Sequence, residues 1–208
     1  MKLPYKKYLS NGSIPFSLRC IFEVKIYPVM TKLLTTLFLL SITQYLLAQS
    51  TPKVPRLSKT PIGNTGSFAY LPDSKATDPF ELSYSPDSSK VYTGDFLEGE
   101  HHFSVILVKF NFSLNTQLEK EDMILNYLEY LKTSFNIVQS AGYGKGHTLE
   151  SAPEATGVID YWVDKDKDKW AIKAWADGNT LAVMMLYGAT EYPIFNVQQM
   201  FLNGFRFK

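Results

Sequence analysis

The chain has 208 residues, with 21 basic and 20 acidic groups. Residues 1–49 hold six of the basic groups and one of the acidic groups, which leaves 15 basic and 19 acidic groups in residues 50–208. A mildly acidic chain has no electrostatic reason to bind nucleic acid or an anionic membrane. The single cysteine, Cys20, lies in the first segment, so the rest of the chain forms no disulfide.

The N-terminal region has the pattern of an export signal. Residues 30–49 begin with Met30 and continue as an apolar stretch from Leu33 to Leu47. This order is typical of a signal peptide, and the apolar part is short for a membrane-spanning helix, which needs about 20 residues. We expect an extracytoplasmic protein, periplasmic or secreted, with no stable membrane span after cleavage; an uncleaved anchor is the alternative. We also expect residues 1–29 to be an over-extended reading frame, with a long basic leader as the alternative.

The next segments predict a tether and then a folded domain. Residues 50–76 are rich in Pro, Ser, Thr, Lys and Gly, which predicts a flexible tether containing one early strand. A single domain is expected over residues 77–208. It should begin with two short strands, over residues 79–84 and 90–96, joined by a turn.

A long strand and an amphipathic helix follow. Residues 101–112 are apolar on both faces, which is typical of a central strand that is covered on both sides. Thr116 precedes Glu119 at the spacing of a capping box, so a helix should start there. Apolar residues then recur at helical spacing, and they form one buried stripe: Ile124, Leu128, Leu131 and Phe135.

A sheet meander should come next. A loop at residues 165–168 predicts a register in which Asp160 faces Lys173. In this register Trp162 shares the charged outer face and the other face is apolar. A second hairpin turn is expected near Gly178.

A last helix is predicted over residues 193–203, where Pro193 suits the first turn and Gly204 the stop. The order of strands, helix, meander and helix indicates a single α+β domain. Its antiparallel sheet should carry the long amphipathic helix and the C-terminal helix packed on it.

This layout resembles the PsbP-like fold, the family of the photosystem II accessory protein and the Ran-binding nuclear import factor. The points of similarity are the strand opening PFELSY at residues 79–84, the helix over residues 116–135, the turn at residues 177–179 and the ending FLNGFRF at residues 201–207. The resemblance implies an α/β/α arrangement and an exported accessory or interaction protein. The family shares no catalytic motif, so it gives no functional residue to carry over.

No catalytic, cofactor-binding or metal-binding residue is predicted. The acidic loop at residues 164–168 lacks the Gly and Glu that an EF-hand requires at its sixth and twelfth positions. His101 and His102 are neighbours in a strand and point to opposite faces, so they cannot share a metal ion.

Five residues form the predicted interaction surface. Trp162 and Trp175 fall on the charged face of the meander, where exposed apolar area would mark an interface. The alternative is that a helix or the tether covers them. Tyr143, Lys145 and His147 lie in a Gly-rich loop, which either touches an anion or a partner or is a mobile connection.

Three functions are open at this point. The first is an exported, non-catalytic accessory or interaction module whose partner is another cell-envelope protein. The second is a small-ligand binder with a pocket between sheet and helices, lined by Met184, Met185, Tyr187 or Phe110. The third is a hydrolase that uses His147 or His102. The sequence leaves open whether the protein is an enzyme, and the absence of a nucleophile motif argues against it.

Overall fold

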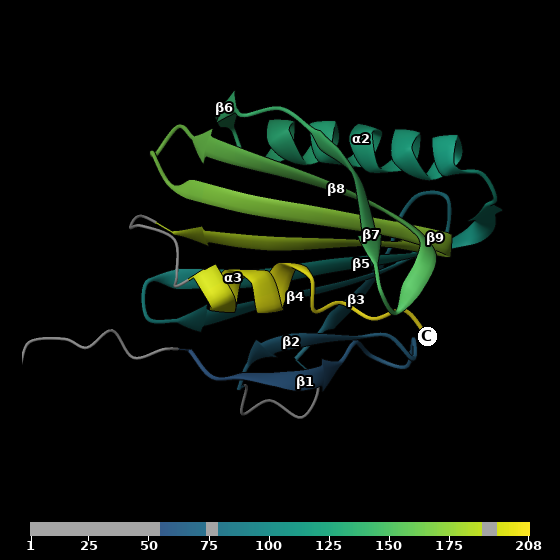
Figure 1. The fold of residues 1–208 in the computed structure, drawn as a ribbon, viewed down its shortest axis with the longest axis horizontal. Helices are drawn as coiled ribbons and strands as arrows, with labels where there is room; N and C mark the ends of the chain where they lie inside the picture. Colours follow the sequence, from purple (N-terminus) through teal and green to yellow (C-terminus); the bar gives the residue numbers. More distant parts are fainter. Residues whose placement is uncertain (1–54, 74–78, 189–194) are drawn as a thin grey trace, which may run out of the picture. The chain divides into compact units, whose positions relative to one another are not determined.

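The computed structural model describes residues 55–73, 79–188 and 195–208 (Figure 1). The predicted extension and signal peptide lie outside the described residues. Residues Lys53–Lys208 form one compact unit. Its elements in chain order are β1 (Leu57–Pro61), β2 (Phe68–Pro72), β3 (Glu81–Tyr84), β4 (Lys90–Glu98), β5 (His101–Leu114), α2 (Gln117–Ser134), β6 (Ile137–Ser140), β7 (Gly144–Leu149), β8 (Ala152–Asp164), β9 (Lys169–Gly188) and α3 (Phe195–Leu202).

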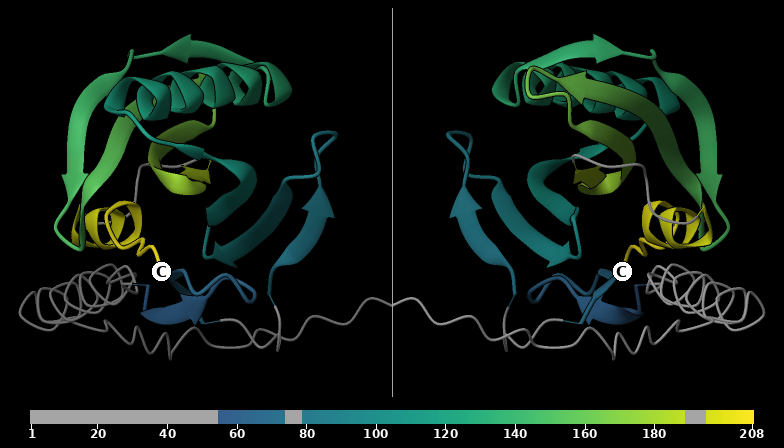
Figure 2. Two further views of the ribbon diagram at one scale, coloured as in Figure 1. Left: turned by 90° about the vertical axis from the view of Figure 1, so that its right-hand side faces the viewer. Right: turned by 90° about the vertical axis from the view of Figure 1, so that its left-hand side faces the viewer.

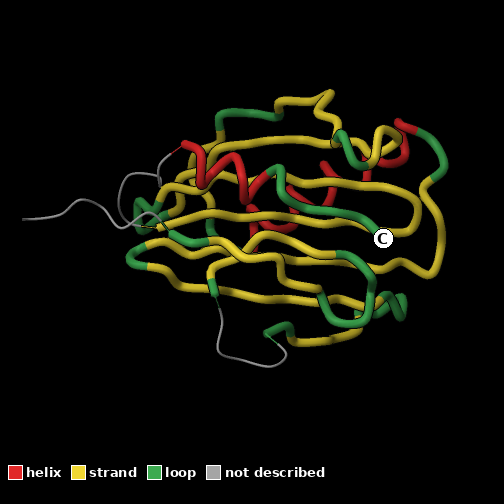
Figure 3. Tube along the Cα trace, turned by 60° about the horizontal axis from the view of Figure 1, so that its bottom comes forward, coloured by secondary structure: helices red, strands yellow, loops and turns green. Residues whose placement is uncertain are grey.

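Strands dominate this unit, as Figure 3 shows. The large sheet has the order β3-β4-β5-β9-β8-β6, with β7 paired to β8, and every pairing is antiparallel. Helices α2 and α3 lie on opposite sides of it (Figure 2). The predicted α+β class is therefore confirmed. Neither helix of the described part is long and apolar enough to cross a membrane.

Two hydrophobic clusters cover the two faces of the central strand β5. Val105 belongs to the cluster under α3, and its neighbour Ile106 belongs to the cluster under α2. Successive side chains of a strand point to opposite faces, so β5 separates the two clusters. The expected doubly covered central strand is confirmed.

Helix α2 begins and ends where local chemistry dictates. The Thr116 side chain accepts a hydrogen bond from the Glu119 backbone N–H, and the Glu119 carboxylate accepts one from the Thr116 backbone N–H. This reciprocal pair satisfies two backbone donors that a helix start leaves free. The chain leaves the helix through Asn136, which has a φ of 53°, and Ile124 and Leu128 are fully buried on the sheet side.

Strand β9 doubles back on itself. Its residues 169–176 pair with β8 and its residues 180–187 pair with β5. A continuous extended strand would place Trp170 and Tyr187 about 55 Å apart, whereas their ring centroids are 3.9 Å apart. Gly178, with a φ of 52°, lies between the two halves. The predicted hairpin near this residue is confirmed.

The predicted register between β8 and β9 is wrong by one residue. Trp162 faces Trp170, and Asp160 faces Ile172. Asp160 and Trp162 therefore lie on the α2 face and not on an outer charged face. Both Asp160 and Asp164 are buried, and they accept hydrogen bonds from the indole N–H groups of Trp162 (2.6 Å) and Trp170 (3.0 Å). A buried carboxylate with such donors does not need to face water.

Part of the predicted tether is folded. Within residues 57–72, β1 and β2 pair as an antiparallel hairpin, and Ile62 and Leu71 are fully buried in the cluster under α3. The tether prediction is wrong over this range, while the early strand within it is confirmed as β2. The two glycines of this range, Gly63 and Gly66, lie in the connecting turn and adopt positive φ.

The predicted mobile Gly-rich connection is also wrong over β7, which pairs with β8. A Cβ on Gly144 would lie 2.8 Å from Ile159 Cγ2, and one on Gly157 would lie 2.2 Å from Trp175 Cζ3. The glycines here permit close packing of backbone against side chains.

Candidate functional site

A pocket of about 510 Å³ opens on the α2 side of the sheet, beside the C-terminal end of α2. Strands β4, β5 and β9 contribute most of its lining, and β3 contributes part of its rim. Its polar lining consists of Glu81, Thr93, Asp95, Ser104 and Tyr187. Its apolar lining includes Ile106, Phe135 and Met185.

Strand pairing brings the polar groups together. Asp95 of β4 lies directly opposite Ser104 of β5, and His102 of β5 lies directly opposite Tyr187 of β9. His102 and Ser104 are two residues apart in one strand and so share a face. Three separate strands therefore converge on Asp95.

Asp95 is held by three donors. Its Oδ1 atom accepts a short hydrogen bond from Ser104 Oγ and a longer one, 3.4 Å, from the Tyr187 hydroxyl. Its Oδ2 atom lies 2.7 Å from His102 Nδ1, which must carry the proton because an ionised carboxylate only accepts. Burial raises the pKa of Tyr187, and the Asp95 charge raises it further, so the phenol stays a donor at neutral pH.

Four rings stack in a column beside the pocket. Phe135 stacks on Trp170 at a centroid distance of 5.0 Å, Trp170 on Tyr187 at 3.9 Å, and Tyr187 on His102 at 4.6 Å. The Trp170 indole N–H donates to Asp164, which fixes the ring. The column gives the pocket a rigid wall because each ring is held by its neighbours.

Sequence reasoning identified part of this site. Met185 and Tyr187, two of the residues expected to line a pocket between sheet and helices, line this pocket, whereas Phe110 is not among its lining residues and Met184 lies in the cluster on the opposite face. Asp95 was missed. The signal that could have found the site is Ser104, the one polar residue within residues 103–108 of β5.

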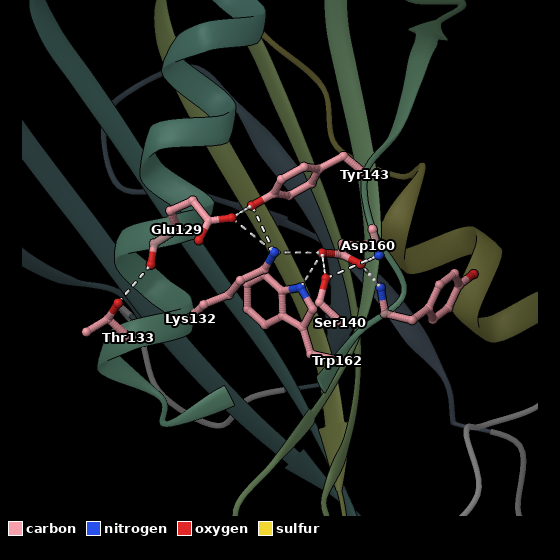
Figure 4. Close-up of polar contacts among 9 residues, drawn as sticks. Glu129, Lys132, Thr133, Ser140, Tyr143, Asp160 and Trp162 are labelled. Carbon is pink, nitrogen blue, oxygen red and sulfur yellow. Dashed lines mark hydrogen bonds and ion pairs between the residues drawn. The ribbon is translucent and has the colours of Figure 1, made fainter. Parts of the chain in front are cut away.

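A second polar cluster joins α2 to β8 (Figure 4). The fully buried Asp160 carboxylate accepts hydrogen bonds from Ser140 Oγ (2.6 Å), the Gly142 backbone N–H (3.0 Å) and the Trp162 indole (2.6 Å), and it forms an ion pair with Lys132 (3.2 Å). Burial alone would raise the pKa of Asp160, but these donors hold it below its usual value. Each of these contacts joins two parts of the fold, so the cluster stabilises the packing of α2 on β8.

Tyr143 belongs to the same cluster. Its hydroxyl donates a short hydrogen bond to Glu129 and accepts one of 2.9 Å from Lys132. Lys132 also lies 4.1 Å from the centroid of the Tyr143 ring. Lys145, with 48% of its side chain exposed, pairs loosely with Glu121 at 3.5 Å. The structure therefore places Tyr143 in a packing role and leaves Lys145 at the surface.

The two tryptophans of the predicted interaction surface are buried, with 1% of Trp162 and 0% of Trp175 exposed. Of the two alternatives that the sequence leaves open, an exposed surface and cover by a helix or the tether, the structure has cover by a helix. Trp162 packs in the cluster under α2, and the Trp175 indole donates to the Leu202 carbonyl of α3 (3.0 Å).

His147, the last predicted residue, contacts a buried amine. Its Nδ1 atom lies 3.3 Å from Lys173 Nζ, which donates to Asn203 Oδ1 at 2.6 Å and lies 4.7 Å from the Trp175 ring centroid. Lys173 forms no ion pair with a carboxylate of the described residues, and burial lowers its pKa to about 8. Burial also lowers the pKa of His147, and the Lys173 charge lowers it further.

Within the part of the chain that the structure describes, no group of three or more His, Cys, Asp or Glu side chains is arranged to hold a metal ion. A search against protein-family models found no match to this chain, and a search of curated proteins found none either.

Proposed function

We propose that this protein binds a small organic molecule in the pocket beside α2. The observation that carries the proposal is the pocket itself, whose volume of about 510 Å³ falls within the range of about 300–1,000 Å³ typical of ligand sites. It combines apolar walls with a few convergent polar groups, the composition that such sites use to orient a ligand.

The arrangement around Asp95 favours binding over chemistry. In a serine hydrolase the histidine lies between the serine and the carboxylate, so that it can take the hydroxyl proton. Here Asp95 lies between Ser104 and His102, and Ser104 donates to the carboxylate. Asp95, Ser104 and His102 therefore form a fixed set of hydrogen-bonding groups in the pocket region.

A pocket-filling variant tests the proposal. Thr93 is half-buried and lines the pocket, so Thr93→Trp should occupy the space that a ligand needs. Ser113→Trp adds the same ring at an exposed position of β5 that does not line the pocket. In a ligand-observed NMR screen of small fragments, binders of the wild type should also bind Ser113→Trp and lose binding to Thr93→Trp. A screen without any binder sensitive to Thr93→Trp would overturn the proposal.

The predicted export is also a proposal, supported by the signal-like pattern of residues 30–49. Sequencing the N-terminus of the protein from its host would test it, and a mature chain that still contains residues 30–49 would overturn cleaved export. The resemblance to the PsbP-like family and the role of an interaction module for a cell-envelope partner stay predictions. The interaction module has lost its main argument, because Trp162 and Trp175 are buried.

A further inference from the structure

The lining of the pocket beside α2 is charged with one sign. Among the residues that the structure describes, it includes two carboxylates, Glu81 and Asp95, and neither a lysine nor an arginine. We propose that the pocket selects an organic cation whose ammonium or guanidinium group bears N–H donors and is attached to an apolar body. This inference rests on the proposed function and names the class of ligand for the same pocket.

The two carboxylates are close enough to share one cation. Glu81 of β3 lies directly opposite Thr93 of β4, and Asp95 lies two residues further along β4 on the same face. Diagonal neighbours of this kind have Cα atoms about 7–8 Å apart, within reach of a donor group placed between them.

The carboxylates have different roles. Asp95 is fixed by Ser104, His102 and Tyr187, so it offers the ligand an oriented acceptor with 46% of its side chain still exposed. The Glu81 side chain forms no hydrogen bond or ion pair with any residue in the described ranges, and the residue is exposed, so its carboxylate can adjust to the ligand. A fixed acceptor reduces the entropy that binding costs, and a mobile one adapts to ligands of different length.

The ring column favours N–H donors over quaternary ammonium groups. Tyr187 of the second half of β9 stacks against Trp170 on one side and His102 on the other. The Trp170 ring projects from the first half of β9, and the His102 ring projects from β5. Both faces of the Tyr187 ring are therefore covered, and only its edge reaches the pocket. A quaternary cation is recognised through open aromatic faces, whereas a primary ammonium is recognised through hydrogen bonds to carboxylates. The Tyr187 edge and the Phe135 ring, which stacks on Trp170 through one face, suit the apolar body of the ligand.

Four probes of one shape test the selectivity with the full chain. They are 2-phenylethylamine, 2-phenylethanol, 3-phenylpropanoate and 2-phenylethyltrimethylammonium, titrated by ligand-observed NMR. A charge-assisted hydrogen bond implies that the primary amine binds about tenfold or more tightly than the alcohol. The quaternary amine should bind more weakly than the primary amine, and the carboxylate should bind most weakly.

Matched variants assign the effect to the carboxylates. Glu81→Gln should lower the affinity for the primary amine about tenfold and leave the alcohol unchanged, because the Glu81 side chain has no hydrogen-bond or ion-pair partner among the described residues. Glu150→Gln removes an exposed carboxylate that does not line the pocket and should change neither affinity.

The outcomes separate this inference from the proposed function. If the alcohol or the carboxylate probe binds as tightly as the amine, the cation selectivity is wrong while the ligand pocket stands. The same holds if other fragments bind in a manner sensitive to Thr93→Trp and the amine does not. If no fragment shows such sensitivity, both proposals fall. Tighter binding of the quaternary probe than of the primary amine would refute the role assigned to N–H donors.

Discussion

The Lys173→Met variant should remove a pH-dependent loss of stability. Burial lowers the pKa of Lys173 from 10.5 to about 8 in the folded state, while the unfolded chain keeps a value of about 10.4. Between these pH values the unfolded state binds a proton that the folded state does not, so the free energy of unfolding rises with pH. The cost of burying the ammonium is fully present below pH 8 and disappears as the pH approaches 10.5.

The magnitude follows from the size of the pKa change. A difference of about 2.5 pH units corresponds to about 3 kcal/mol at about 1.4 kcal/mol per unit. Methionine has a similar volume and no charge, but it loses the hydrogen bond to Asn203 (2.6 Å), worth about 1 kcal/mol. At pH 7 the variant should therefore be about 2 kcal/mol more stable than the wild type, and near pH 10 this advantage should vanish.

Urea unfolding followed by circular dichroism from pH 7 to pH 10 measures this difference. Subtracting the variant from the wild type at each pH cancels other titrating groups, such as Tyr127, whose pKa burial raises to about 12. Lys145→Met, at a half-exposed position, is the control and should show a difference that does not change with pH. A wild-type minus Lys173→Met difference that stays flat over this range would refute the reasoning.

Two further stability changes should follow from the contacts of α2. Asp160→Ala removes the carboxylate that pairs with Lys132 and should lower the free energy of unfolding by about 3 kcal/mol, because a buried ion pair loses one partner. The control, Asp166→Asn at the exposed hairpin tip, should change the free energy of unfolding by less than about 0.5 kcal/mol. Equal effects of the two variants in urea unfolding would contradict the role assigned to Asp160. Thr116→Ala removes the helix cap and should cost about 1 kcal/mol, whereas Thr116→Ser keeps the hydroxyl and should cost little; similar losses in the two variants would count against the capping role.

The elements that the sequence predicts well are those whose chemistry is local. The Thr116–Glu119 pair satisfies its donors within four residues, so the start of α2 can be read without knowing the rest of the fold. The left-handed residue Asn136 and the hairpin turn at Gly178 are local in the same sense.

The register of β8 could not be predicted because its polar groups are satisfied internally. The alternation of apolar and polar residues predicts that Asp160 and Lys173 both face outward. Because opposite charges attract across a hairpin, it also favours a register in which the two residues lie opposite each other. In the structure each has a partner inside: Asp160 accepts from the Trp162 indole and pairs with Lys132 of α2, and Lys173 donates to Asn203. A hydrophobic pattern does not indicate that an indole or amide group can serve as the buried partner of a charged side chain. The pattern therefore predicts that Asp160 and Lys173 face outward.

The pocket lies on strands whose apolar faces the hydrophobic alternation predicts well, and yet only some of its lining residues can be predicted from the sequence. In the structure Ile106 of β5 and Met185 of the second half of β9 lie in one cluster, the one under α2. Hydrophobic alternation does not predict which residues of neighbouring strands lie opposite one another. The polar part of the pocket depends on such a pairing, because Asp95 of β4 lies opposite Ser104 of β5. The register error in β8 leaves this site intact, because β8 does not line the pocket. A sequence can therefore misplace the buried Trp162 and still assign Met185 and Tyr187 to the lining of one pocket.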